Sequence, residues 1–600
     1  MYLSRPVYEY ISQIMHDPII EWRKCIISWT EFPIFQSDHD FLEKASPVYD
    51  GLKYPIPLPI ICPTERERLR LSFRNERKLY KRKCDYSWNT IVTIYSSDAP
   101  YVVYDRNIRL SDQRNALDYG KVFDPEKSFF TQFDELIHVV PRRNVVVTPD
   151  SEWATYSHIT ISSKNIYMSF SITYSENVLY TTSADRCVNC MDCFNIVDCE
   201  LCYGCVMTES SQKCFFCFHS KKCFDCRYCE DCENCSSCIG CIGLINKQYC
   251  IDNTQVSKEE FQIQVEYIKV HGRDQTQSTS YHHTPRQYAH ISQSENSFGD
   301  YIRDSKNGLA MFVTYANEDC RYMSRSFENK DCRDGYGIGK SELIYNSVAA
   351  SMGASHCSFC TFCIGSHYLL YCDNCDGCTH CFACAGLRNK EYCIFNTQYS
   401  KADYETEVVN IITHMIQTGE WWQFFPSSLS PFGYNQTIAQ DIYPAMREEF
   451  VVTNTDEWSL GTSNHQLTTL GYKRSDYNTD ITIPLWAVVL QGDNIPSDAK
   501  TVSDDILQSI FICEVSAKPF VIQKKELELL RLRGLPLPRR HHDVRHRERS
   551  QHIYNRKLYL RSCDQTEENV VSIYPPREIS SGNKSFPVYG ERAYQNFLYG

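Results

Sequence analysis

The cysteines between Cys187 and Cys250 follow a strict three-residue spacing. Every gap between successive cysteines in this stretch is a multiple of three residues, and from Cys223 to Cys241 every third residue is a cysteine. Thiols at this density can bind zinc or another thiophilic ion, form disulfides, or fill an interior as small apolar side chains. We favour reduced, packed thiols over metal binding, and metal binding over disulfides. The metal candidates in this pattern are Cys223, Cys226, Cys229, Cys232, Cys235, Cys238, Cys372, Cys375, Cys378 and Cys381.

A second ladder of cysteines runs from Cys357 to Cys393, and it repeats the first ladder at a constant offset (357 − 214 and 393 − 250 both equal 143). In both ladders the last cysteine is followed seven residues later by a serine, Ser257 or Ser400, which is typical of a helix N-cap. The sequence therefore predicts an internal duplication in which each ladder ends in a capping helix.

The elements that position these cysteines must repeat every three residues. An α-helix repeats every 3.6 residues and a flat strand every 2. A long 3₁₀ helix is unstable, and polyproline II does not suit a stretch without proline. A β-solenoid whose coils hold a multiple of three residues remains, with cysteines stacked inside it. Cys320 and Cys332 stand outside the three-residue frame, and the spacing gives them no role.

Two outer modules also repeat each other. In the N-terminal module, Cys25 and Cys62 precede a basic helix and a strand that ends at Tyr95. The same order of parts follows Cys513, and several positions match at one constant offset (541 − 62 and 574 − 95 both equal 479). This arrangement predicts two copies of a small zinc-ribbon-like module.

Zinc ligands in these modules are incomplete. His541 occupies the position of Cys62, an exchange that zinc sites tolerate. However, Ser28 and Glu65 stand where Cys-x-x-Cys pairs would place their second cysteines. We therefore expect a zinc-ribbon shape held by packing, and zinc binding is the alternative. The candidate ligands are Cys25, Cys62, Cys513 and His541.

The basic helices of the two modules allow a second functional hypothesis. Arginines interleaved with aromatic residues can contact phosphates, although the net charge of −12 gives no global attraction to nucleic acid. The simpler interpretation is a solvated helix face, or ion pairs with acidic groups of the same chain. The candidate nucleic-acid contacts are Arg66, Arg70, Arg74, Arg545 and Arg549.

The predicted fold class is α+β and β-rich, with two copies of a cysteine-lined β-solenoid-like core flanked by two copies of the zinc-ribbon-like module with its basic helix. The predicted domains are the N-terminal helix and module (1–150), the first ladder with its capping helix (151–273), the second ladder with its capping helix (298–420), an aromatic connecting region (421–511) and the C-terminal module (512–600).

At these motifs the chain resembles a family of long, cysteine-rich, zinc-ribbon-like proteins of uncharacterised function that is common in candidate-phyla (Patescibacteria-like) bacteria. The resemblance covers nearly everything from Cys25 onward and rests on several motifs in order. It implies the architecture but no activity, because the family has none established. The motifs are Arg74-Asn75-Glu76-Arg77, Phe129-Phe130-Thr131-Gln132-Phe133 with Pro141, Asn389-Lys390-Glu391-Tyr392, Ser430-Pro431-Phe432-Gly433-Tyr434-Asn435 and Cys513-Glu514-Val515.

No motif for a phosphate-binding loop, a zinc protease or a nucleophile elbow is present, so we expect no enzyme. No apolar run reaches membrane-spanning length, and the N-terminus lacks the pattern of a signal peptide. We expect a cytoplasmic product that acts as a structural or interaction scaffold, by self-assembly or with protein partners, for example in a virus particle. The alternative is a zinc-dependent protein that associates with nucleic acid.

Overall fold

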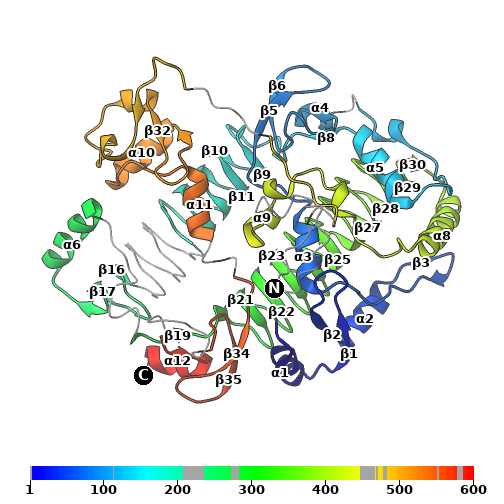
Figure 1. Ribbon diagram of the computed structural model, residues 1–600, viewed down its shortest axis with the longest axis horizontal. Helices are drawn as coiled ribbons and strands as arrows, with labels where there is room; N and C mark the ends of the chain where they lie inside the picture. The colour runs from blue at the N-terminus through cyan, green and yellow to red at the C-terminus, as the bar shows by residue number, and fades with distance from the viewer. Residues whose placement is uncertain are drawn as a thin grey trace, which may run out of the picture.

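The computed structural model describes residues 3–111, 114–206, 235–271, 283–445, 467, 470–477, 483–550, 553, 555–576 and 586–599. The fold is β-rich, and its centre is a β-solenoid in two stretches, which Figure 1 shows in teal to green and in green to yellow. Small modules from the two ends of the chain pack against these stretches.

The first stretch is built from short parallel strands that pair at intervals of 12 residues; Lys164 pairs with Glu176, and Glu176 pairs with Val188. The antiparallel strand β18 then closes the described part of the stretch. The strands are β9 (Ser157–Ile161), β10 (Lys164–Tyr167), β11 (Ser169–Thr173), β12 (Glu176–Leu179), β13 (Thr182–Asp185), β14 (Val188–Met191), β15 (Phe194–Val197), β16 (Ser236–Ile239), β17 (Gln248–Ile251) and β18 (Thr254–Gln255).

The second stretch forms one continuous sheet in chain order, with the same parallel pairing up to β29 and an antiparallel closing strand, β30. Its strands are β20 (Ile291–Ser292), β21 (Phe298–Arg303), β22 (Leu309–Tyr315), β23 (Arg321–Phe327), β24 (Arg333–Tyr336), β25 (Glu342–Val348), β26 (Ser355–Ser358), β27 (His367–Leu370), β28 (Thr379–Phe382), β29 (Glu391–Ile394) and β30 (Thr397–Gln398).

The three-residue period has a simple backbone cause. Every third residue has a left-handed backbone conformation, as at Asn165, Met168 and Ser171, whose φ angles are 56°, 46° and 58°. Each such residue turns the chain, and the next side chain, as at Ile166 and Ile172, points into the interior. A 12-residue coil therefore has four short sides, and each side contributes one buried residue. The prediction of a β-solenoid is confirmed, and most of its described coils hold 12 residues, a multiple of three.

The same geometry explains Cys320 and Cys332. Both are fully buried inside the second stretch. The coil that joins β25 to β26 is one residue longer than its neighbours. There the Cys360 N–H donates to the Ser347 hydroxyl across 13 residues, whereas the corresponding bond in a later coil spans 12 residues. The extra residue shifts the three-residue frame by one position, so the two cysteines are out of frame in the sequence but in line in the structure.

Helices α6 (Lys258–His271) and α8 (Lys401–Thr418) follow the two stretches, as predicted. The Ser400 hydroxyl accepts a hydrogen bond from the Asp403 backbone N–H at 3.2 Å, and the Ser257 hydroxyl does the same for Glu260. Both serines are therefore the N-caps that the sequence predicts.

Gly299 lies at a bulge between β21 and β22, and its φ of +153° favours glycine. A Cβ atom there would lie 1.8 Å from the Met311 carbonyl oxygen, whereas at Gly353 (φ +90°) nothing lies within 4 Å. We expect Gly353→Ala to cost about 1–2 kcal/mol through backbone strain alone. We expect Gly299→Ala to cost about 1–3 kcal/mol more, because the bulge must move. Urea unfolding of the two variants tests this, and equal losses would contradict it.

The N-terminal module lies along one edge of the second stretch (Figure 1). Its basic helix is shorter than the arginine pattern suggests: α3 ends at Leu71, so Arg74 lies in the loop after it. The elements are α1 (Arg5–Met15), β1 (Ile19–Lys24), β2 (Glu31–Phe35), α2 (Gln36–Ala45), β3 (Val48–Tyr49), β4 (Leu52–Lys53), α3 (Pro63–Leu71), β5 (Tyr80–Lys83), β6 (Thr90–Thr93), β7 (Val103–Tyr104), α4 (Arg106–Leu110), α5 (Phe129–Val139) and β8 (Arg142–Arg143).

The C-terminal module has elements at matching positions. Helix α11 begins and ends at one constant offset from α3 (542 − 63 and 550 − 71 both equal 479), and α10 is related to α2 in the same way (524 − 36 and 533 − 45 both equal 488). The elements around and within it are α9 (Ile438–Ile442), β31 (Val489–Leu490), β32 (Ile510–Ile512), β33 (Pro519–Phe520), α10 (Lys524–Arg533), α11 (His542–Ser550), β34 (Tyr559–Ser562), β35 (Asn569–Ser572), β36 (Val588–Tyr589) and α12 (Glu591–Tyr599); β36 pairs with β19 (Arg286–Gln287).

Candidate functional site

The arginines of α3 are buried against the second solenoid stretch. Arg66 Nη2 lies 2.9 Å from Asp334 Oδ2, and Arg70 Nη1 lies 3.1 Å from Asp334 Oδ1. Arg70 also donates to the Asn346 side-chain oxygen at 3.0 Å. Its side chain is 1% exposed and that of Asp334 is 2% exposed. One carboxylate thus holds two guanidinium groups and fastens the helix to the solenoid.

The arginines of α11 make the corresponding contact with the first stretch. Arg545 forms an ion pair with Asp192, and Arg549 Nη2 lies 3.0 Å from the other carboxylate oxygen of Asp192. Arg545 also reaches Glu526 of α10 at 3.3 Å. The two arginine helices are therefore exchanged: α3 of the N-terminal module docks on the second stretch, and α11 of the C-terminal module docks on the first.

Arg74 completes the set of predicted phosphate contacts. Its Nε donates to Glu76 at 2.6 Å, and Arg325 of β23 binds the second oxygen of Glu76, also at 2.6 Å. Figure 1 shows α3 beside β23 and β25. All five arginines proposed as nucleic-acid contacts are buried and paired with carboxylates of the same chain. They therefore do not form an exposed basic surface. The sequence alone does not show this pairing, because the acidic partners of α3 and α11 lie far away in the sequence.

Four tight turns each place a cysteine thiol in a ring of hydrogen-bond donors. In the first, the Cys25 carbonyl accepts from the Trp29 N–H at 3.0 Å, and the Ser28 N–H points to the Cys25 sulfur at 3.5 Å. The residue four positions after each cysteine is left-handed, and the residue three positions after it carries a hydroxyl. The turns begin at Cys25, Cys84, Cys513 and Cys563.

These donors stabilise thiolates. Burial raises the pKa of the Cys84 thiol, but hydrogen bonds from the Ser87 hydroxyl and from the backbone of Ser87 and Asp105 outweigh it, so the pKa lies below its ordinary value. The pKa values of Cys513 and Cys563 are lowered in the same way. The turns thus resemble the knuckles that hold zinc thiolates, but each supplies a single sulfur.

The four predicted zinc ligands of the modules come together in pairs. A hydrogen bond with the Cys62 thiol lowers the pKa of the Cys25 thiol to about 4, and the Ser28 hydroxyl lies 3.5 Å from the Cys62 sulfur. In the other module, the backbone N–H of His541 hydrogen-bonds to the Cys513 sulfur. Each pair supplies two ligands, which is fewer than a closed tetrahedral zinc site needs.

Position 541 has another role, since it immediately precedes the arginine helix α11. Cys62 has the same place before α3, but its side chain makes no capping hydrogen bond. The His541 Nδ1 atom accepts the Asp543 backbone N–H at 3.1 Å. Burial lowers the pKa of His541 to about 4, so the ring is neutral and can accept this bond at neutral pH. Helix capping therefore accounts for His541, without zinc.

A group of three potential metal ligands within 4.8 Å occurs at His541, His542 and Asp543, and it is the one such group in the described ranges. Arg77 and Lys78 already form ion pairs with the Asp543 carboxylate, at 3.2 and 3.3 Å. Two cations beside the carboxylate oppose the binding of a third, so this cluster does not favour a metal.

The ladder cysteines that the structure describes are buried, and their thiols contact backbone carbonyls. Cys372 donates to the Leu370 and Cys381 carbonyls, both at 3.5 Å, and other ladder thiols follow the same pattern. Burial raises the pKa of the candidates Cys372 and Cys375 above the ordinary value, whereas metal ligands are thiolates. In the same ladders, hydrogen bonds with neighbouring thiols outweigh burial and lower the pKa of Cys190 and Cys384 to about 5. The candidates Cys235, Cys238, Cys372, Cys375, Cys378 and Cys381 lie in such ladders, and Cys223, Cys226, Cys229 and Cys232 lie outside the described residues.

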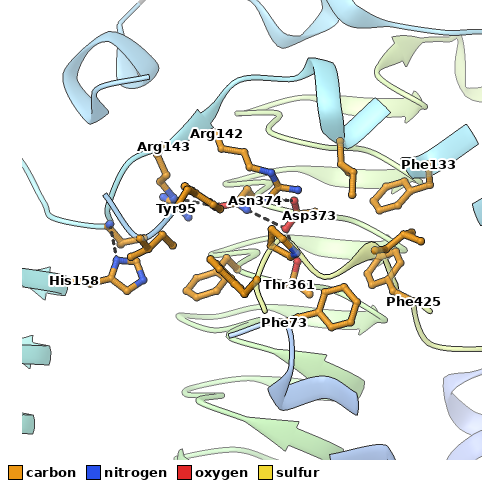
Figure 2. A pocket seen from close by; sticks show the side chains of 17 residues that line it. Phe73, Tyr95, Phe133, Arg142, Arg143, His158, Thr361, Asp373, Asn374 and Phe425 are labelled. Atoms are coloured by element: carbon orange, nitrogen blue, oxygen red, sulfur yellow. Dashed lines mark hydrogen bonds and ion pairs between the residues drawn. The ribbon is translucent and has the colours of Figure 1, made fainter. Parts of the chain in front are cut away.

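A pocket that the sequence analysis missed lies where the N-terminal module meets both stretches (Figure 2). Arg142 of β8 pairs with Asp373 at 2.8 Å, and Asp373 also accepts from the Thr361 hydroxyl. His158 of β9 lies at one end of the pocket, and Phe133 and Phe425 lie at the other. A single histidine in a β-like run does not predict such a site. The adjacent arginines Arg142 and Arg143 after Pro141 were the one sequence feature that could have indicated it.

Comparisons with protein-family models, with curated proteins and with solved structures found no match to this chain. The predicted family resemblance therefore stays a prediction. Among the described residues, no helix is long and apolar enough to cross a membrane.

Proposed function

We propose that this protein is a non-enzymatic scaffold for self-assembly or for protein partners, built from two copies of a solenoid stretch and two copies of a zinc-ribbon-like module. The observation that supports it best is the buried arginine–carboxylate docking of both modules, which fastens them to the solenoid. The matching bounds of α3 with α11, and of α2 with α10, support the duplication.

An exposed apolar segment supports the interaction role. Leu485 and Trp486 are 106% and 82% exposed, and β31 follows them at the edge of its sheet. Exposed apolar side chains beside an edge strand are typical of a surface that another chain covers. Two copies can pair such edges about a twofold axis, so we propose self-assembly through this segment, in an assembly such as a virus particle.

Light scattering over a protein concentration series tests this proposal. We expect the average mass to rise with concentration, and the double variant Leu485→Ser and Trp486→Ser to reduce that rise. Tyr368→Ser is the matched control, because Tyr368 is also exposed but lies on a solenoid face. A monomeric protein at all concentrations, or equal assembly of the variant and the wild type, would contradict self-assembly through this segment.

The state of the thiols distinguishes packing from metal binding. The packing interpretation requires reduced thiols, and the 26 described cysteines are all buried. We therefore expect at least 26 thiols per chain to react in denaturant without reductant, and few to react in the native protein. Zinc and iron measured by elemental analysis on untagged protein should be well below one ion per chain. Several zinc ions per chain would support the zinc-dependent alternative, and a deficit of thiols without metal would indicate disulfides.

The nucleic-acid alternative has less support, because its five arginines are buried in ion pairs. Fluorescence anisotropy with labelled DNA and RNA tests it directly. Salt-dependent binding that Arg70→Gln weakens, without loss of fold, would favour the alternative over the scaffold.

A further inference from the structure

The pocket beside Arg142 is small and has apolar walls. Aromatic rings from five separate segments line it, and the free space at its centre is about 30 Å³. This space holds one or two water molecules, or a ligand of a few non-hydrogen atoms. The aromatic rings are Phe73, Tyr95, Phe133, Phe362, Phe425 and Phe432.

Hydrogen-bond donors without partners face this space. The His158 Nδ1 atom accepts the Val146 backbone N–H at 3.1 Å, so the proton of the neutral ring is on Nε2. This Nε2 atom is buried and has no partner, and the side chain is 1% exposed. Arg142 Nε and Arg143 Nη2 are also buried without partners. Each unpaired buried donor costs free energy, so a ligand that accepts hydrogen bonds is favoured.

The acceptors of the pocket are already used. The Asp373 carboxylate binds Arg142, the Thr361 hydroxyl and the Asn374 amide, the last at 2.9 Å. The Asn374 side-chain oxygen accepts from Arg143 at 3.3 Å. A ligand with donor groups would therefore find few partners.

The guanidinium groups favour the same kind of ligand. Both guanidinium groups of the pocket have a carboxylate partner, since Arg142 pairs with Asp373 at 2.8 Å and Arg143 pairs with Asp376 at 3.3 Å. Burial is the main cause that lowers the pKa of His158, to about 3, so the ring is neutral at physiological pH. Two of the three unpaired donors belong to guanidinium groups, whose hydrogen bonds are strongest to a carboxylate, and the aromatic wall suits a short alkyl group.

We infer that this pocket binds a small monocarboxylate of the size of acetate or propionate, with its carboxylate toward His158 and Arg143 and its alkyl group toward Phe133 and Phe425.

The test uses the full-length protein labelled with ¹⁵N at histidine. Titration with acetate or propionate is expected to shift the His158 Nε2 resonance in a saturable way, and sodium chloride at equal ionic strength is expected to leave it unchanged. This measurement needs no variant. An unchanged resonance up to 50 mM carboxylate would mean that water alone fills the pocket, and an equal shift with chloride would mean a general anion site; either result overturns the inference.

A variant pair sharpens the test. Asparagine at position 158 can still accept the Val146 N–H but lacks the Nε2 donor, so His158→Asn is expected to weaken propionate binding at least tenfold by calorimetry. His356→Asn is the matched control, because His356 lies on an outer solenoid face and is not part of the pocket. Unaltered propionate affinity in a folded His158→Asn variant would overturn the inference.

Discussion

Replacing Asp334 with asparagine is expected to destabilise the protein by about 3–5 kcal/mol, because Arg66 and Arg70 would be left buried without a charge partner. The loss should appear as a lower urea midpoint and a lower melting temperature. Asp192→Asn is expected to produce a loss of similar size, because Arg545 and Arg549 share that carboxylate.

Glu328→Gln is the matched control on the same solenoid stretch. Lys340 Nζ lies 3.9 Å from the Glu328 carboxylate, and the two side chains are 55% and 46% exposed. An exposed pair of this kind contributes about 0–1 kcal/mol. If Asp334→Asn cost no more than Glu328→Gln, the docking of α3 would not depend on the buried pairs.

Acid is expected to remove about 3 kcal/mol of stability through Glu76 alone. Burial opposes ionisation, but the charges of Arg325 and Arg74 outweigh it, so the pKa of Glu76 is lowered to about 2, from about 4.5 in an unfolded chain. A lowered folded-state pKa means that the stabilisation is complete above about pH 4.5. It is lost as the pH falls from about 4.5 to about 2, at about 1.4 kcal/mol per pKa unit.

Urea unfolding from pH 2.5 to pH 7 tests this expectation with two variants. Glu76→Gln should be less stable than the wild type at pH 7, and the difference should shrink toward pH 2.5. Glu328→Gln is again the control, because that carboxylate is exposed and its pair with Lys340 should contribute at most about 1 kcal/mol over this pH range. Parallel stability curves for the wild type and Glu76→Gln would contradict the assignment.

The three-residue spacing of cysteines was enough to predict the solenoid, since the spacing excludes the other regular structures. The frame of Cys320 and Cys332 was not predictable, because one extra residue between β25 and β26 changes the phase without any local signal. The capping serines were predictable, because N-cap chemistry is local.

The functional residues were harder to interpret. The arginines of α3 and α11 are visible as a charge pattern, but Asp334 lies 264 residues from Arg70 and cannot be assigned from the sequence. Likewise, His158 matters only because residues from five other segments of the chain line the same pocket. Contacts between remote segments, rather than local preferences, decide these two sites.

The docking of the C-terminal helix α11 on the first solenoid stretch has a consequence for synthesis on the ribosome. Asp192 and the neighbouring buried side chains Met191 and Phe194 are covered by elements near the C-terminus. Arg545 is synthesised 353 residues after Asp192. At a translation rate of roughly 5–20 residues per second, roughly 20–70 s pass before the elements that cover the first stretch are complete. During that interval the nascent chain exposes an apolar face, and chaperones that shield such faces would act on residues 157–206.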